Sequence, residues 1–83
     1  MKRIKGESCN LANLKIGQRA KIISLEINDS EIKRHLLELG IIEGTEVQIK
    51  KKAPFGEPVV VALRGYELFL GYQELRKIQV EVL

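Results

Sequence analysis

One stretch of this chain decides its fold: residues 36–65 read LLELGIIEGTEVQIKKKAPFGEPVVVALRG. A short helix ends at one glycine, Gly40, and an alternating strand follows a second glycine, Gly44. A Pro/Gly turn at residues 54–58 then leads into a valine-rich strand. Almost every residue here has an architectural role and almost none can carry out chemistry. The stretch therefore predicts a small β-barrel with one helix rather than an active site.

The alternation of apolar and polar residues predicts the strands. Thr45, Val47 and Ile49 point inward in a strand over residues 45–51. The other strands are predicted over residues 18–27, 59–63 (the central one), 67–70 and 78–82, with one helical turn over residues 73–77. The apolar phase slips at Ile22-Ile23, which predicts a β-bulge. We expect a mainly β fold, a small five-stranded SH3-like barrel with one short helix inserted between strands 1 and 2.

The same pattern sets the domain boundaries. Eighty-three residues allow one domain. Residues 1–8 lack a periodic apolar pattern, so we expect a flexible N-terminal tail there. Residues 9–83 should form a single domain, which opens with a lead-in turn over residues 10–17.

The inserted helix has clear start and stop signals. Either Asn28, with Glu31 three residues later, or Asp29 alone can cap its first N–H groups. The apolar side chains that fall within one narrow arc, and that we expect to face the barrel, are Ile32, Leu36 and Leu39. Gly40 is placed to adopt the left-handed conformation that ends a helix.

Charge is unevenly distributed along the chain. The net charge is +3, yet residues 28–47 carry two basic and five acidic side chains. Such a dipolar surface can steer a protein partner. The Lys50-Lys51-Lys52 run favours a solvated strand edge over a phosphate site. No apolar run is long enough for a membrane span or a signal peptide, and a lone Cys9 fits a reducing cytoplasm.

Candidates for chemistry are few. His35 is the only histidine and has Glu31 one turn before it, so a metal site would pair these two, with Cys9 approaching from the tail. Zinc and iron sites need three or four ligands in a fixed cage, which favours a surface histidine instead. Cys9 lacks a neighbouring base or second thiol and is expected to be an ordinary thiol. The glycines do not form a phosphate-binding loop. We expect no enzyme activity, no cofactor and no bound metal.

Four motifs carry a resemblance to a known family: Leu36-Leu37-Glu38-Leu39-Gly40-Ile41, Gly44-Thr45-Glu46-Val47, Ala53-Pro54-Phe55-Gly56-Glu57-Pro58 and Ile78-Gln79-Val80. Their order and spacing, from about Leu11 to Val82, resemble the FeoA family. These are small cytosolic SH3-like proteins associated with the ferrous iron transporter FeoB, a membrane protein with a cytosolic GTPase domain. The chain departs from the common pattern at Glu43, His35 and Gly71, where proline, arginine and arginine are frequent.

The resemblance implies a cytoplasmic, non-enzymatic accessory protein of ferrous iron uptake that binds and modulates FeoB. We expect the contact surface to be an exposed helix face with the turn after the second strand: Lys33, Arg34, Leu37, Glu38 and Phe55. Phe55 is equally suited to plugging the barrel end and to anchoring a partner. The alternative is a stand-alone repressor-type SH3-like domain or a small nucleic-acid-binding barrel. The oligomeric state stays open.

We expect the purified protein to bind ferrous iron only weakly, because one histidine and one cysteine supply too few strong ligands. Calorimetric titration at neutral pH is the measurement. One tight ferrous site per monomer would contradict the expectation.

Overall fold

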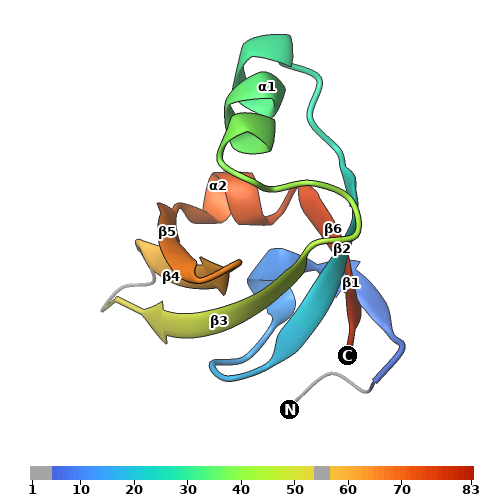
Figure 1. Cartoon of the computed structure of the whole chain (residues 1–83), viewed down its shortest axis with the longest axis vertical. Coiled ribbons are helices and arrows are strands. Elements are labelled where there is room, and N and C mark those ends of the chain that lie inside the picture. The colour runs from blue at the N-terminus through green and yellow to red at the C-terminus, as the bar shows by residue number, and fades with distance from the viewer. Residues whose placement is uncertain (1–4, 54–56) are drawn as a thin grey trace.

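The computed structural model describes residues 5–53 and 57–83. Its elements, in chain order, are β1 Ser8–Asn10, the 3-10 helix Leu11–Asn13, β2 Arg19–Leu25, α1 Ser30–Glu38, β3 Glu46–Lys52, β4 Val59–Leu63, β5 Tyr66–Leu70, α2 Tyr72–Leu75 and β6 Ile78–Val82. The strands form one six-stranded sheet in the order β1-β6-β2-β3-β4-β5, and all neighbours are antiparallel. Figure 1 shows this strongly curved sheet with α1 standing at one end of the molecule.

The fold is mainly β, as predicted, but the expected number of strands and the expected position of the helix are wrong. The described residues form six strands, and β1 and β5 are the two ends of an open sheet. The helix α1 accordingly lies between the second and third strands, not between the first and second. The additional strand is β1, whose three residues are too few to show an apolar alternation.

Residues 6–8, which we expect to belong to a flexible tail over residues 1–8, pair with the last strand instead. Ser8 lies opposite Glu81 in the β1–β6 ladder. Just before it, the Gly6 N–H donates to the Val82 carbonyl at 2.7 Å, and the Val82 N–H donates to the Glu7 carbonyl at 2.9 Å. Strand pairing is made by backbone N–H and carbonyl groups, so no side-chain pattern in the sequence indicates it. Residues 1–4 lie outside the described part of the chain.

The core follows the predicted alternation. Thr45, Val47 and Ile49 are all buried, as are Ile78, Val80 and Val82 of β6. The predicted bulge is confirmed, because the β2–β6 register shifts between Ile22 and Ser24. The rest of the hydrophobic core comes from other strands, helices and loops, chiefly Leu11, Leu14, Ala20, Ile27, Leu36, Ile41, Val59, Val61, Leu63, Leu70 and Leu75.

The lysine run and the valine-rich segment lie in neighbouring strands of the sheet. Lys51 and Lys52 of β3 pair with Val60 and Val59 of β4, whereas the β2–β3 pairing ends at Gln48. Lys50 and Lys51 are exposed, as expected of a solvated strand edge. Lys52 is half-buried and its Nζ donates to the Leu14 carbonyl at 2.9 Å. The valine-rich β4 is next to the edge strand β5 rather than central. It is apolar because Val60 is buried on one face of the sheet and Val59 and Val61 on the other.

The C-terminus of α1 has the geometry that the sequence predicted. Gly40 adopts a φ of 100°. The Gly40 N–H donates to the Leu37 carbonyl and the Ile41 N–H to the Leu36 carbonyl, each at 3.0 Å, which together form a Schellman motif. The Tyr66 hydroxyl donates to the Leu39 carbonyl and so ties the β4–β5 hairpin to the end of the helix.

Gly40 should tolerate a side chain less well than other glycines of the same conformation. In Gly40→Ala the new Cβ would overlap the Tyr66 hydroxyl, whereas in Gly44→Ala, at φ 90°, it would meet nothing within 4 Å. Both variants lose about 1–2 kcal/mol to the left-handed conformation. Gly40→Ala should lose a further ~1–3 kcal/mol to the overlap. Urea unfolding of both variants measures the difference.

A Tyr66→Phe background separates the two causes. Without the hydroxyl, the nearest ring atom is Tyr66 Cζ, which lies 3.5 Å from the added Cβ. The Gly40→Ala penalty should then fall to that of Gly44→Ala. If Gly40→Ala and Gly44→Ala lower the free energy of unfolding equally in the parent protein, the Tyr66 hydroxyl moves aside without cost and the expectation is wrong.

Candidate functional site

The helix α1 is well formed but shallowly anchored. Asp29 is its N-cap, because Asp29 Oδ1 accepts from the N–H groups of Glu31 at 2.9 Å and Ile32 at 3.2 Å. Of the two capping alternatives in the sequence, the structure therefore uses Asp29. Among the nine residues Ser30–Glu38, Leu36 alone is buried. The remaining side chains of α1 are exposed and available to a partner.

Four of the five predicted contact residues lie together on this helix. Lys33, Arg34, Leu37 and Glu38 are all exposed. Leu37, predicted to point away from the core, is 40% exposed. The fifth, Phe55, lies outside the described residues. Whether these residues contact a partner stays a prediction.

A groove runs along the other flank of α1. We call it the α1/β5 groove; it has a volume of about 440 Å³ and is lined by Glu31, Ile32, His35, Leu36, Leu39, Phe69, Leu70 and Glu74. These residues come from α1, β5 and α2, and Figure 1 shows α1 above α2 and β5. Ile32 was expected to face the barrel, but it is 45% exposed. It lies about 40° around the helix from Leu36, so it projects into the groove instead of onto the sheet.

Phe69 is the contact candidate that the sequence reasoning missed. It is 68% exposed, the largest exposure among the large apolar residues described. Its strand does carry a signal, because Leu68 and Leu70 point to the core side while Glu67 and Phe69 alternate with them. An aromatic residue in the polar phase of an edge strand is therefore the feature to look for. Phe69 also lies opposite Val60 of β4, whose side chain covers the same face of the sheet.

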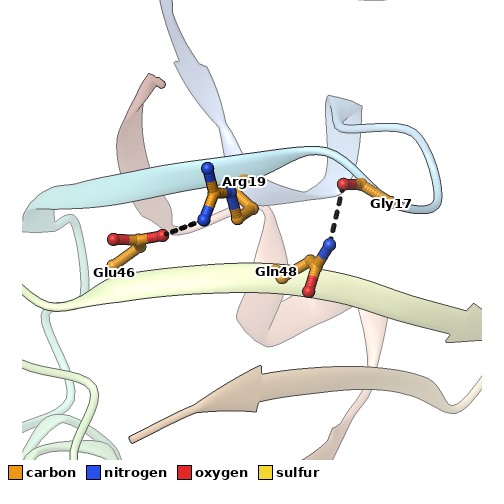
Figure 2. Close-up of polar contacts among 4 residues, drawn as sticks. All are labelled: Gly17, Arg19, Glu46 and Gln48. Carbon is orange, nitrogen blue, oxygen red and sulfur yellow. Dashed lines mark hydrogen bonds and ion pairs between the residues drawn. The ribbon is translucent and has the colours of Figure 1, made fainter.

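A second hollow, of about 750 Å³, lies beside β3 and the β4–β5 hairpin, and its charged lining residues are Arg19, Glu46, Lys50, Arg64 and Glu67. Several of its polar groups are already paired. Arg19 Nη1 lies 3.1 Å from Glu46 Oε2, and Gln48 Nε2 donates to the Gly17 carbonyl at 3.0 Å (Figure 2). Arg64 Nη2 donates to Thr45 Oγ1 at 3.1 Å. These contacts brace neighbouring strands, so this hollow is a weaker binding candidate than the groove.

The candidate metal ligands are not assembled into a site. His35 is exposed on the groove side of α1, near Glu31 in the chain, while Cys9 lies in β1 and packs against the core. Across residues 5–53 and 57–83, no group of three or more His, Cys, Asp or Glu side chains could hold a metal ion. Over the same ranges, no helix is long and apolar enough to cross a membrane.

Comparison with known proteins identifies the class. The model of the FeoA domain matches residues 9–82, so this chain belongs to the FeoA family. A FeoA-like protein from Clostridium acetobutylicum shares 38% identity and a TM-score of 0.82, over 93% of this chain and 88% of that chain. The zinc complex of Stenotrophomonas maltophilia FeoA, an SH3 domain protein, shares 29% identity and a TM-score of 0.77, over 87% and 88%. The fold is therefore SH3-like.

Two further likenesses differ in what they show. A fusion of Fe(2+) transport protein A with the Fe(2+) transporter FeoB, from Porphyromonas gingivalis, is 27% identical over 73 residues. The match covers 88% of this chain but 8% of the fusion protein. A manganese-dependent transcriptional repressor has a TM-score of 0.84 at 19% identity, over 92% of this chain and 37% of that one. At that identity the likeness concerns the fold alone.

The capping assignment can be checked by paired substitutions. Asp29→Ala removes both cap hydrogen bonds and should lower the free energy of unfolding by about 1 kcal/mol. Asn28→Ala, one residue earlier and also exposed, should change it by less than about 0.5 kcal/mol. Urea unfolding of the two variants gives the comparison, and the reverse ranking would move the cap to Asn28.

Proposed function

We propose that this chain is a cytoplasmic accessory protein of ferrous iron uptake that binds the FeoB transporter and modulates it without catalysing a reaction. The observation that carries the proposal is a set of three exposed apolar side chains, Ile32, Leu37 and Phe69. They lie on or beside α1, a helix in which Leu36 alone is buried. Exposed apolar residues that gather around one element are typical of a protein–protein contact. The fused relative supports FeoB as the partner, because there the two proteins are one polypeptide.

The docking surface has two parts in this proposal. One is the outward face of α1 with Lys33, Arg34, Leu37 and Glu38, to which Phe55 is added from the sequence. The other is the α1/β5 groove with Phe69. Aromatic and large aliphatic anchors supply most of the binding free energy at such surfaces, and charged neighbours mainly set association rate and orientation.

Modulation follows from docking onto one state of the transporter. A bound protein shifts a conformational equilibrium only by the difference in its affinity for the two states. The helix end is fixed by the Schellman motif and the Tyr66–Leu39 hydrogen bond, so α1 is presented in one orientation. A surface held in this way can favour whichever FeoB conformation it fits.

The proposal is tested by the affinity of the purified protein for FeoB from the same organism, reconstituted in nanodiscs. Phe69→Ala and Leu37→Glu should each weaken binding roughly tenfold or more, as expected when an anchor side chain is lost. Ile16→Ala is the matched control, because Ile16 is 55% exposed in the turn before β2, away from α1. Circular dichroism of each variant verifies folding.

The same measurements examine the nucleic-acid alternative. Lys50 and Lys51 are the exposed members of the lysine run. Removing both charges should change FeoB affinity by less than about threefold if they act through association rate alone. If instead the protein binds RNA or DNA, and each lost lysine flattens the salt slope by about one unit, the docking proposal is wrong. Unchanged FeoB affinity in both anchor variants would move the contact surface elsewhere.

A further inference from the structure

The lining of the α1/β5 groove combines an apolar floor with an acidic rim. Its apolar members are Ile32, Leu36, Leu39, Phe69 and Leu70. Its acidic members are Glu31 and Glu74, His35 is its one imidazole, and no lysine or arginine of the described chain lines it. An acidic rim is a local feature, because the chain as a whole has a net charge of +3.

The groove is largely preformed. Leu36 and Leu70 are buried and fix its floor from α1 and β5. Glu74 of α2 is held in place, because its Oε1 accepts from the Gly71 N–H at 2.9 Å. A carboxylate has about four acceptor sites, so Glu74 can accept a second donor while keeping this bond. The Tyr66–Leu39 hydrogen bond closes the helix end at the foot of the groove.

The dimensions suit a short segment of a partner protein. The nine residues of α1 are about 13.5 Å long, enough for roughly two turns of a helix or a four-residue strand to lie alongside. A volume of about 440 Å³ is sufficient for one or two large apolar side chains. A segment lying there would bring its flanking residues near Glu31 of α1 and Glu74 of α2, because both line the groove.

Resting on the function proposed above, we infer that the α1/β5 groove binds an apolar side chain of FeoB that has lysine or arginine beside it in the sequence. The apolar side chain covers Phe69 and Ile32. The cationic neighbour pairs with the Glu31 or Glu74 carboxylate. The acidic rim disfavours polyanionic partners, since phospholipid headgroups and nucleic-acid phosphates would face two carboxylates.

Two double variants with the same change in net charge test the rim. Glu31→Gln/Glu74→Gln removes both rim charges, and glutamine retains an acceptor for the Gly71 N–H. Glu26→Gln/Glu43→Gln removes two charges from exposed residues outside the groove. Affinity for FeoB nanodiscs should fall roughly tenfold for the rim variant at low salt and by less than about twofold for the control, since close charge pairs outweigh distant ones. Raising the salt concentration should reduce the difference.

Overlapping peptides covering the cytosolic segments of FeoB identify the occupant. Peptides that shift the amide NMR signals of Ile32 and Phe69 should contain an apolar residue next to lysine or arginine. Replacing that basic residue of the peptide by glutamate should abolish the shifts, and the Phe69→Ala substitution in this protein should abolish them as well. If groove-binding peptides are acidic or uncharged, the inference is overturned.

The outcomes separate this inference from the function on which it rests. If the parent protein does not bind FeoB, the proposed function fails. If FeoB binds but the rim and control variants lose the same affinity, the acidic-rim inference fails and the function stands. Analytical ultracentrifugation of the parent protein and the rim variant measures self-association, and so tests whether a second copy of this chain occupies the groove. Self-association that only the rim variant loses, or binding of phosphatidylserine vesicles that Phe69→Ala abolishes, would overturn the inference.

Discussion

The attachment of α1 to the sheet is the contact on which the rest of the surface depends. Leu36 is its one buried residue, and the helix then ends at Gly40 in a conformation that places Leu39 under the Tyr66 hydroxyl. The buried residue Ile41 follows Gly40 directly. A longer helix, or a straighter path after it, would therefore carry the chain away from the hairpin. The orientation of α1, and hence both flanks available to a partner, follows from this short C-terminal segment.

The sequence specified what local chemistry determines. The alternation of Thr45, Val47 and Ile49 located β3, the phase slip at Ile22-Ile23 located the β2 bulge, and Gly40 located the helix end. Each of these features depends on neighbouring residues, whose periodicity or conformational freedom indicates a single local structure. The sequence left open whether Asn28 or Asp29 caps α1, because both side chains can accept the same hydrogen bonds.

The sequence could not specify the features that depend on contacts between distant segments. β1 is held by backbone pairing with β6, and no pattern in three residues predicts it. The burial of Ile32 depends on how far α1 stands from the sheet, and the exposure of Phe69 depends on β5 being an edge strand. The predicted residues of α1 thus form one half of the candidate surface, and the groove half emerges only when α1, β5 and α2 are brought together. Phe55 lies outside the described residues, so its contact with a partner stays a prediction.

Pairing of β1 with β6 also brings the two ends of the domain side by side. Ser8 lies opposite Glu81, and Gly6 is bonded to Val82. Figure 1 shows the C-terminal end of β6 far from α1, which occupies the opposite end of the molecule. A linker joined at either terminus therefore starts from the same place and leaves α1 and its groove uncovered. Covalent attachment to another protein then raises the local concentration of the free face without obstructing it. This arrangement makes the domain a module that can be tethered by either terminus.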